Sequence, residues 1–430
     1  MSDLLLKGGR VIDPGQNMDT VADVLIRDGK IAAIGENLKA EDAEVKDVAG
    51  MILCPGLVDI HCHLREPGLE RKETIATGTR AAAAGGFTTV LPMPNTAPVA
   101  DNPASMMYVR DRAKETGVVH VYPIGAISKG SKGLELAEMS AMADAGAVAF
   151  SDDGRPVESS RLMRLAMEYS LITKLPLIAH EEDLALVDEG DMNEGYVSTV
   201  LGLKGNPAAA EETMIARDII LARLTGARLH VAHVSTAQGA QMIREAKAEG
   251  LNITAEVTPH HLTLTEEAVR GYDTNTKVNP PLRRREDVDA LIEALKDGTI
   301  DCVATDHAPH TIEDKVVEYH FAANGITGFE TALPLLWTEL VQTGRLTAEE
   351  LIRAMSCAPA KVMNLPAGSL AVGAAADVTV FDPETILAVD KHRFCSKGKN
   401  TPFHGRLFSG WPMMTVVSGK IVMEDREIKE

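Results

Sequence analysis

The stretch DIHCHLREPG, residues 59–68, places His61 and His63 one residue apart at the end of an apolar run. A buried histidine is costly unless it has a partner. Because side chains alternate along a strand, His61 and His63 share a face with Asp59, whereas Cys62 takes the opposite face. Two imidazoles on one face indicate a metal site, and we expect Cys62 to point away from it.

Other histidines and acids also stand at or just after the ends of apolar runs: His180, His233, His260, His261, His307, His310, Asp153 and Asp306. Any one of these histidines taken alone is explained more simply as a packed or capped structural residue. Their joint occurrence favours a shared site, because imidazole and carboxylate at this density suit a zinc-like divalent ion. With His61 and His63, two more strand-end histidines and two strand-end aspartates would make six ligands. Six ligands exceed the needs of one tetrahedral zinc, whereas two metals that share a bridging carboxylate and a hydroxide would use them.

Such a site predicts hydrolysis. A metal lowers the pKa of bound water from about 15.7 towards 7 and so supplies hydroxide at neutral pH. A nearby carboxylate can accept the proton as the hydroxide attacks and then pass it to a leaving nitrogen. Asp306 is placed for both roles, so the expected reaction is the hydrolysis of an amide or, in reverse, its cyclisation.

Eight short apolar runs with helical patterns between them must position these residues. They span 56–63, 87–95, 118–127, 147–153, 175–182, 227–235, 252–261 and 301–309. Strands alternating with helices predict a (β/α)₈ TIM-like barrel, which carries its chemistry on the loops at the carboxyl ends of its strands. The main alternative is an open doubly wound sheet, but no GxGxxG follows the first run, which weakens a dinucleotide-binding version.

The two chain ends share a different pattern. Alternating apolar runs broken by glycine, typical of β-hairpins, occur near the start and again near the finish. Each end alone is too short to bury a sheet face. We therefore expect a small composite β-sandwich domain built from residues 1–54 and 366–430, next to a metal-dependent hydrolase barrel at 55–365.

Composition excludes several classes of protein. The 430 residues carry 43 Lys and Arg against 62 Asp and Glu, a formal net charge of -19, which argues against a nucleic-acid partner. The five cysteines are odd in number and form no CxxC pair, which indicates a reducing compartment, and we expect the cytoplasm. The sequence has no signal peptide and no apolar stretch of about 18 residues, so no membrane association is expected.

Several separated motifs carry a family resemblance. The stretches PGLVDIHCHLREPG and ATDHAPH, with the terminal strands, resemble the amidohydrolase superfamily over essentially the whole chain. MPNT (93–96), AFSDDG (149–154), TPHHL (258–262), KVNPPLR (277–283) and GITGFET (325–331) narrow the resemblance to class I bacterial dihydroorotases. This resemblance implies the interconversion of dihydroorotate and N-carbamoyl-aspartate in pyrimidine synthesis.

The resemblance also implies residue roles. His61, His63, Asp153 and Asp306 would hold one zinc, and Asp153, His180 and His233 would hold a second, so that two Zn²⁺ bind per subunit. Asp306 would also be the catalytic base. Substrate contacts would come from His63, Arg65, Asn95, Asn279, His310, Asn324 and Gly325, with Arg65, Asn95 and His310 on the carboxylate and Asn279 on the ring amide. A guanidinium offers a planar fork suited to a carboxylate.

The sequence departs from its relatives at two places. Many carry a carbamylated lysine on the fourth strand where this chain has SDDG, so an aspartate must bridge the metals, and either Asp152 or Asp153 can be that residue. Asn324-Gly325 stands where relatives often carry Phe-Gly, in the loop expected to contact the ring.

Three other functions stay open. Hydantoinase or allantoinase is the near alternative, although both usually need the missing lysine. A non-catalytic dihydroorotase-like partner of aspartate transcarbamoylase would lose metal ligands, whereas this chain keeps six. A nucleotide-binding α/β protein would need a phosphate loop. The pattern leaves open a homodimer and a complex with aspartate transcarbamoylase.

Overall fold

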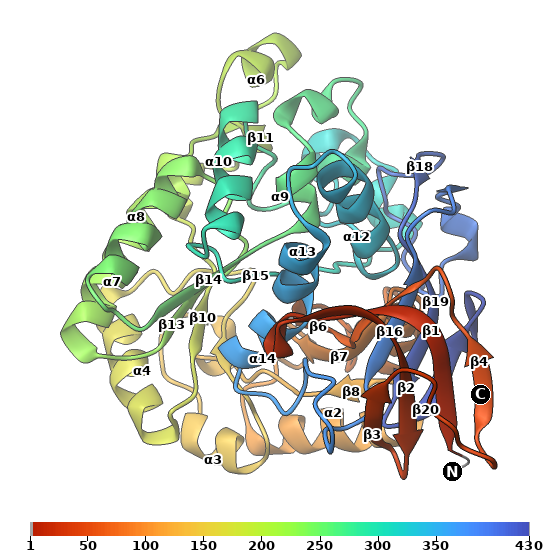
Figure 1. Ribbon diagram of the computed structural model, residues 1–430. Helices are drawn as coiled ribbons and strands as arrows, with labels where there is room; N and C mark the ends of the chain where they lie inside the picture. Colours follow the sequence, from red (N-terminus) through yellow and green to blue (C-terminus); the bar gives the residue numbers. More distant parts are fainter. Residues whose placement is uncertain (1–2, 430) are drawn as a thin grey trace.

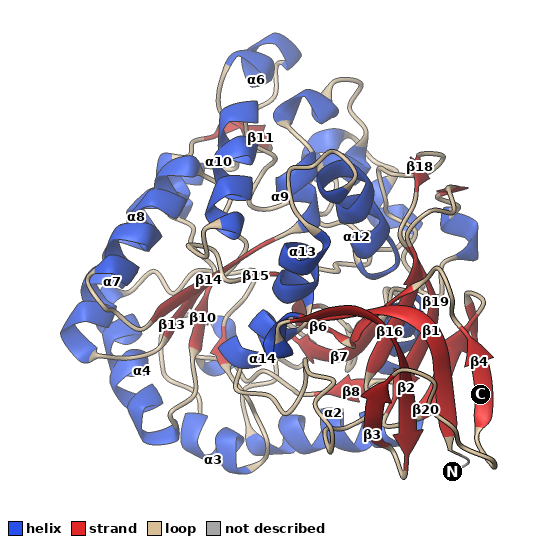
Figure 2. Ribbon diagram, in the orientation of Figure 1, coloured by secondary structure: helices blue, strands red, loops and turns tan. Residues whose placement is uncertain are grey.

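Eight short parallel strands lie inside a belt of helices in the computed structural model, which describes residues 3–429 (Figures 1 and 2). These strands are β6 (Leu57–Cys62), β7 (Phe87–Pro92), β8 (His120–Val121), β9 (Phe150–Ser151), β10 (Leu177–Ala179), β13 (Leu229–Val231), β14 (Ile253–Val257) and β15 (Cys302–Val303). Each lies within one of the eight apolar runs of the sequence. Most are shorter than their run, because the rest of the run leaves the ladder to form the loops that carry the polar residues.

The parallel pairing passes from each strand to the next. One group pairs in the order β6–β7–β8 and the other in the order β9–β10–β13–β14–β15. Parallel bridges join Gly125 to Phe150 and Cys62 to His307, and so connect the two groups at both sides. The amide of His63 reinforces the second connection by donating to the carbonyl of His307 at 2.9 Å. The hydrogen bonding thus returns from the eighth segment to the first, whereas the open sheet considered above would end in two unpaired edges.

Helices follow the strands in turn and form the outer belt (Figure 2). The longer ones are α1 (Ile75–Ala84), α2 (Pro103–Thr116), α3 (Met139–Asp144), α4 (Ser160–Thr173), α7 (Ala209–Thr225), α8 (Ala237–Ala248), α10 (Arg285–Lys296), α12 (Phe329–Leu336) and α13 (Ala348–Met355). Local sequence explains their ends. Thr74 caps α1 by accepting from the amide of Thr77, and Gly85 ends the helix. Thr236 caps α8 in the same way.

The connections after the fifth and seventh strands carry extra elements, as their length in the sequence indicates. The first contains α5 (Leu184–Val187), β11 (Met192–Asn193), α6 (Tyr196–Leu201) and β12 (Gly205–Asn206), and the second contains α9 (Pro259–Thr263). The remaining short elements are α11 (Ile312–Lys315), α14 (Cys357–Val362), β17 (Leu387–Ala388) and β18 (Leu407–Phe408).

Both chain ends contribute to one nine-stranded sheet at the side of the helical belt (Figure 1). Its strands are β1 (Leu4–Asp13), β2 (Met18–Arg27), β3 (Lys30–Gly35), β4 (Glu44–Asp47), β5 (Ile52–Pro55), β16 (Val378–Asp382), β19 (Trp411–Val417), β20 (Lys420–Glu424) and β21 (Glu427–Ile428). The two ends meet where β5 pairs antiparallel with β16. A separate buried cluster that includes Leu6, Val24, Val378 and Val416 packs this sheet.

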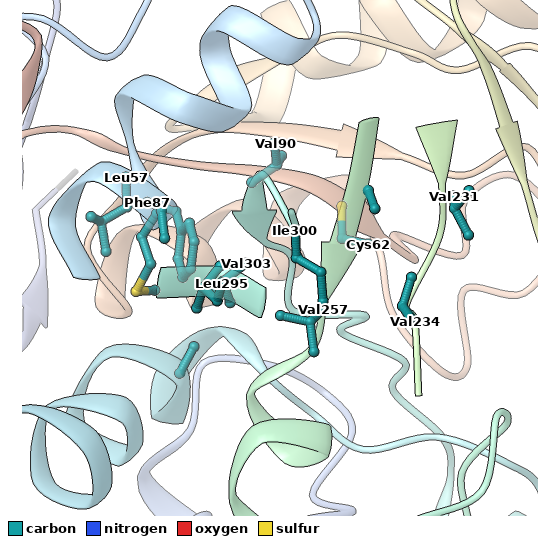
Figure 3. Close-up of a cluster of buried hydrophobic side chains, with 14 of the residues drawn as sticks. Leu57, Cys62, Phe87, Val90, Val231, Val234, Val257, Leu295, Ile300 and Val303 are labelled. Atoms are coloured by element: carbon teal, nitrogen blue, oxygen red, sulfur yellow. The ribbon is translucent and has the colours of Figure 1, made fainter. Parts of the chain in front are cut away.

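The largest hydrophobic cluster fills the space between the parallel strands and the helices (Figure 3). Leu57, Phe87, Val90 and Val257 belong to it, and so does Cys62, whose side chain is fully buried there. The expectation that Cys62 points away from the histidines is therefore confirmed, because its side chain packs in this cluster, although the pairing of β6 with β7 is irregular between Asp59 and Cys62. No helix among residues 3–429 has the length and apolarity to cross a membrane.

Candidate functional site

Six polar side chains from five strand ends meet at the carboxyl ends of the parallel strands. His61 is the penultimate residue of β6 and His63 directly follows the strand, while Asp153, His180, His233 and Asp306 follow β9, β10, β13 and β15. Side chains of these six residues are almost completely buried. His233 and Asp306 have φ values of 32° and 46°, in the left-handed region that non-glycine residues rarely occupy. Such backbone strain concentrates at functional sites, where the surrounding structure enforces it.

Asp153 stands at the centre of this cluster. Its Oδ1 lies 3.3 Å from Nε2 of His61, 3.5 Å from Nε2 of His233 and 3.6 Å from Nδ1 of His180, and its Oδ2 lies 3.6 Å from Nε2 of His63. Burial alone would raise the pKa of Asp153, but the surrounding imidazoles hold it well below its usual value. The carboxylate is therefore ionised and faces four histidines from two sides.

The neighbouring Asp152 is turned away from the histidines. Its Oδ1 accepts from the amides of Ile127 and Ser128 at 2.9 and 3.0 Å, and its Oδ2 accepts from the hydroxyl of Ser128. Through these hydrogen bonds, Asp152 stabilises the loop after β8. Of the two aspartates that the sequence left open, Asp153 is the one that faces the histidines.

Asp306 occupies the side of the cluster next to His63. Nε2 of His63 lies 2.9 Å from Oδ1 of Asp306, and Nδ1 of the same ring lies 2.9 Å from the side-chain oxygen of Asn95. Burial opposes ionisation of Asp306, but the hydrogen bond with His63 and the positive charge of His61 outweigh it and keep its pKa well below the usual range. Asp306 therefore starts as a carboxylate that can take up a proton.

Two glutamates that sequence analysis did not identify each contact a ring nitrogen of a histidine in the cluster and so orient the ring. Glu256 on β14 approaches Nδ1 of His61 to 2.5 Å and lies 3.1 Å from Nε2 of His230. The two histidines lower the pKa of Glu256 to about 2 despite its burial. Glu182 lies 3.1 Å from Nε2 of His180, which leaves Nδ1 of that ring facing Asp153. Carboxylates in this position fix the ring orientation of metal-binding histidines.

The donor set fits metal ions. His61, His63 and Asp306 offer three ligand atoms within 4.8 Å of one another, and so do His61, Asp153 and His233. Within residues 3–429, Nε2 of His61 and Oδ1 of Asp153 are buried without a hydrogen bond, although they lie 3.3 Å apart. Leaving buried polar atoms unpaired costs about 1–3 kcal/mol each, and a cation between them removes that cost.

A cavity of about 190 Å³ opens beside the cluster. All the residues expected to contact substrate line it, namely His63, Arg65, Asn95, Asn279, His310, Asn324 and Gly325. The metal side of this cavity also includes Asp153, His180, His233 and Asp306. The structure thus brings together every residue that the sequence placed in the site.

Arg65 makes one side of the cavity a cationic wall, and the neutral ring of His310 lies beside it. Arg65 has a φ of 61°, its Nε is buried without a hydrogen bond within residues 3–429, and its Nη2 lies 3.5 Å from Nε2 of His310. Sequence analysis missed Lys72, whose Nζ lies 3.1 Å from Nδ1 of His310 and 3.2 Å from Oδ2 of Asp314. Because an ammonium only donates, Nδ1 of His310 must accept, and the ring proton lies on Nε2. Lys72 thereby holds the ring with its Nε2–H towards the carbonyl of Asn324.

Loop residues 324 and 325 are held by a second residue that sequence analysis missed. The Nε2–H of His310 donates to the carbonyl of Asn324 at 2.8 Å. Asn400 accepts from the amide of His310 at 2.9 Å and donates to the carbonyls of Ala308 and Gly325 at 2.9 and 3.0 Å. Gly325 has a φ of 137°, and a Cβ there would lie 2.6 Å from Cβ of Ala308. The close packing therefore requires glycine, and Asn400 fastens both loops.

The other strand-end residues have structural contacts. Asp59 accepts from the amide and hydroxyl of Thr305 and so joins β6 to the segment after β15. His261 contacts Thr258 and the carbonyl of Pro280, and His307 contacts Glu73. His260 is buried close enough to His233 and His61 that their charges, added to its burial, lower its pKa to about 4.

Comparison with known proteins places the chain among cyclic amide hydrolases. A family profile described as "Dihydro-orotase-like" matches residues 50–239. A dihydroorotase from Pelotomaculum thermopropionicum is 57% identical over 99% of this chain and 100% of its own length. A dihydroorotase from Syntrophus aciditrophicus is 55% identical over 98% of this chain and 99% of its own.

Solved structures with the same fold come from related hydrolases. An L-hydantoinase (dihydropyrimidinase) from Arthrobacter aurescens superimposes with a TM-score of 0.91 at 28% identity, covering 100% of this chain and 98% of its own. A dihydropyrimidinase from Brevibacillus agri NCHU1002 gives a TM-score of 0.87 at 26% identity, over 99% and 96% of the two chains.

Proposed function

The chain belongs to the dihydroorotase family, and on that premise we propose that its cavity interconverts dihydroorotate and N-carbamoyl-aspartate with the help of two divalent metal ions. The observation that carries this proposal is one cavity with a cluster of histidines and aspartates on one side and a cationic wall on the other. The cluster of histidines and aspartates suits attack on a ring amide, and the cationic wall suits an acidic substrate.

We assign one Zn²⁺ to His61, His63, Asp153 and Asp306, and a second to Asp153, His180 and His233. The two buried atoms without hydrogen bonds, on His61 and Asp153, support this assignment. Bound zinc would lower the pKa of water towards about 7 and supply hydroxide at neutral pH. Glu256 and Glu182 would hold His61 and His180 in place.

Asp306 is the residue that moves the proton in this proposal. His63 occupies its Oδ1, which leaves Oδ2 to accept a proton when water adds to the ring carbonyl. When the ring C–N bond breaks, Asp306 returns that proton to the nitrogen, which would otherwise depart as a poor anion. In the reverse direction, the same oxygen takes the proton from the attacking ureido nitrogen.

The cationic wall would bind the substrate carboxylate. Arg65 offers a planar fork whose Nε forms no hydrogen bond within residues 3–429, Asn95 lies beside His63, and His310 lines the same wall. Asn279, which donates to Glu182 at 3.0 Å and lies 3.4 Å from His180, is placed for the ring amide. Backbone atoms of Asn324 and Gly325 would contact the far side of the ring.

The same proposal extends to the domain boundaries, the cellular compartment and the partners of the protein. We assign residues 55–365 to a (β/α)₈ barrel and residues 1–54 with 366–430 to a composite β-sandwich domain, as the continuous strand pairing and the shared sheet support. Five free cysteines fit a reducing compartment, the cytoplasm. We also propose that the protein forms a homodimer and binds aspartate transcarbamoylase.

Substrate choice tests this function. Purified, metal-loaded protein is assayed with dihydroorotate, dihydrouracil, hydantoin and allantoin side by side. Dihydroorotate is expected to be opened far faster than dihydrouracil, because only the former carries the carboxylate for Arg65 and His310. Comparable rates on these two rings would overturn the assignment, and faster opening of hydantoin would favour the hydantoinase alternative, which the solved structures at 26–28% identity suggest.

A further inference from the structure

A second group of metal-ligating side chains lies outside the cavity, in the loop between β17 and β18. Asp390, His392 and His404 each offer one ligand atom, and these atoms lie within 4.8 Å of one another. The two imidazole rings stand edge to face with centroids 5.5 Å apart. Within residues 3–429, this is the one such group that contains none of the residues of the cavity.

The fold itself brings the three residues together. β17 pairs antiparallel with β18. The ladder continues through the amide of Val389, which donates to the carbonyl of Arg406 at 2.8 Å, and the amide of Gly405, which donates to the carbonyl of Val389 at 2.9 Å. Asp390 and His404 therefore sit on opposite legs of a closed loop, next to its base. Their proximity follows from strand pairing and needs no metal.

Two of the ligands are already oriented. Oδ1 of Asp390 accepts from the amide of His392 at 3.0 Å, which leaves Oδ2 free to coordinate. Nδ1 of His404 lies 3.1 Å from the carbonyl oxygen of Val389. The amide nitrogen of Lys391 lies farther from the same Nδ1, at 3.4 Å. The shorter contact, with the carbonyl, favours the proton on Nδ1 and leaves the lone pair on Nε2. A ring nitrogen bound to a backbone carbonyl is the usual support for a histidine that holds a metal through its other nitrogen.

The chemistry of the three ligand side chains indicates which class of metal ion this site would bind. Two imidazoles and one carboxylate favour zinc and related borderline divalent ions over calcium or magnesium. Ligands of a tetrahedral zinc at 2.0–2.1 Å lie about 3.3 Å apart, a spacing inside the 4.8 Å that bounds the three ligand atoms here. His392 and His404 are exposed, so their side chains can rotate to reach it. Water would fill the fourth position.

The same loop reaches the cavity. Ser396 contacts the buried Glu73, and Asn400 holds His310 and Gly325. A metal that joins Asp390 to His404 would tie the two legs of the loop that carries these residues. Cross-linking a loop at its base reduces the conformations that it can otherwise sample.

We propose that Asp390, His392 and His404 form a third metal site, selective for Zn²⁺-like ions, that clips the 389–406 loop closed. This site is separate from the catalytic metals and does not depend on the proposed function.

Calorimetry on the full-length protein tests the proposal. The active-site positions are first loaded with zinc, and the excess is removed. Further Zn²⁺ is then titrated into wild type, His392→Ala and His404→Ala. Wild type is expected to bind one additional ion per chain, and each variant to bind it at least tenfold more weakly, since even groups that only support a metal ligand contribute about 10–100-fold in affinity.

A matched control removes another exposed histidine. His320 contacts Asp191 at 3.0 Å away from this loop, so His320→Ala should keep the additional site. Amide hydrogen exchange of residues 389–406 should slow on zinc addition in wild type and His320→Ala but not in the other two variants. Absence of a third equivalent in wild type, or its survival in both His392→Ala and His404→Ala, would overturn the proposal.

Discussion

The two sides of the cavity are built in different ways. On the metal side, the cluster residues stand at or just beyond the ends of β6, β9, β10, β13 and β15, so the parallel sheet brings them together. On the substrate side, Arg65, His310 and Gly325 lie on loops that Lys72 and Asn400 hold from a distance in sequence. The metal side therefore depends on strand register, and the substrate side depends on individual long-range hydrogen bonds.

This difference predicts how substitutions on each side of the cavity affect activity. Removing a group from the metal side takes away a ligand shared within a rigid cluster and should abolish activity. Removing a supporting group from the substrate side leaves the metals in place and should weaken substrate binding by degrees. Variants on the two sides can therefore be separated by metal content.

Asp153→Ala is expected to have the largest effect. It removes the carboxylate that faces four histidines, so both metals should be lost and turnover should fall by more than about 100-fold, the upper end of what a supporting residue costs. Atomic emission and a turnover assay on the same sample measure both. Asp152→Ala is the matched control, since it should destabilise its loop and retain metal. If Asp152→Ala loses the metals while Asp153→Ala keeps them, the bridge is misassigned.

Arg65→Met should act on substrate binding alone. Hydrogen bonds to charged groups are worth about 1.5–3 kcal/mol. The KM for dihydroorotate should therefore rise about 10- to 100-fold while the metal content stays at the wild-type value. Arg161→Met removes an exposed arginine and serves as the control. An unchanged KM would remove Arg65 from the carboxylate site.

Asn400→Ala should affect both stability and binding. It leaves the amide of His310 and the carbonyls of Ala308 and Gly325 without their partner, at about 1–3 kcal/mol for each buried group that stays unsatisfied. We expect a lower midpoint of unfolding and a severalfold higher KM, with full metal content. Asn252→Ala, at an exposed position, should change neither quantity. A wild-type KM in Asn400→Ala would show that the loops do not need this link.

Lys72→Met should give the smallest change. Loss of one ordinary hydrogen bond, about 0.5–1.5 kcal/mol, corresponds to a rise in KM of about two- to twelvefold, because Nδ1 of His310 would lose the donor that holds the ring in place. Lys132→Met, at an exposed lysine, controls for the loss of positive charge. A KM equal to that of wild type would mean that Lys72 does not fix the ring.

The same difference explains what the sequence predicts. Alternation of neighbouring residues is enough to place His61 and His63 inward and Cys62 outward, and strand ends gather the six side chains of the cluster. Alternation did not distinguish Asp152 from Asp153, because the chain turns there and hydrogen bonds to Ile127 and Ser128 decide the orientation. No local pattern signals Asn400 or Lys72, since their partners are 90 and 238 residues away.

Glu256 was missed for a different reason. It lies on a strand and faces inward, as alternation from Thr254 and Thr258 allows, but a single acid in an apolar strand carries no motif. An isolated charge in a strand whose neighbours are buried is itself a signal, because burial without a partner is unfavourable. The isolated charge of Glu256 therefore predicts a cationic or hydrogen-bonding partner nearby, such as a histidine.

Asp306→Asn tests the central claim, that one carboxylate beside the metals carries the proton, most directly. Asparagine keeps the shape and part of the coordinating ability but cannot cycle a proton. The measurement is kcat, with metal content and dihydroorotate affinity determined on the same sample. The account predicts a loss of at least about 10²–10⁴-fold in kcat, full metal and nearly unchanged affinity. A metal-replete Asp306→Asn within about tenfold of wild type, below that range, would contradict it.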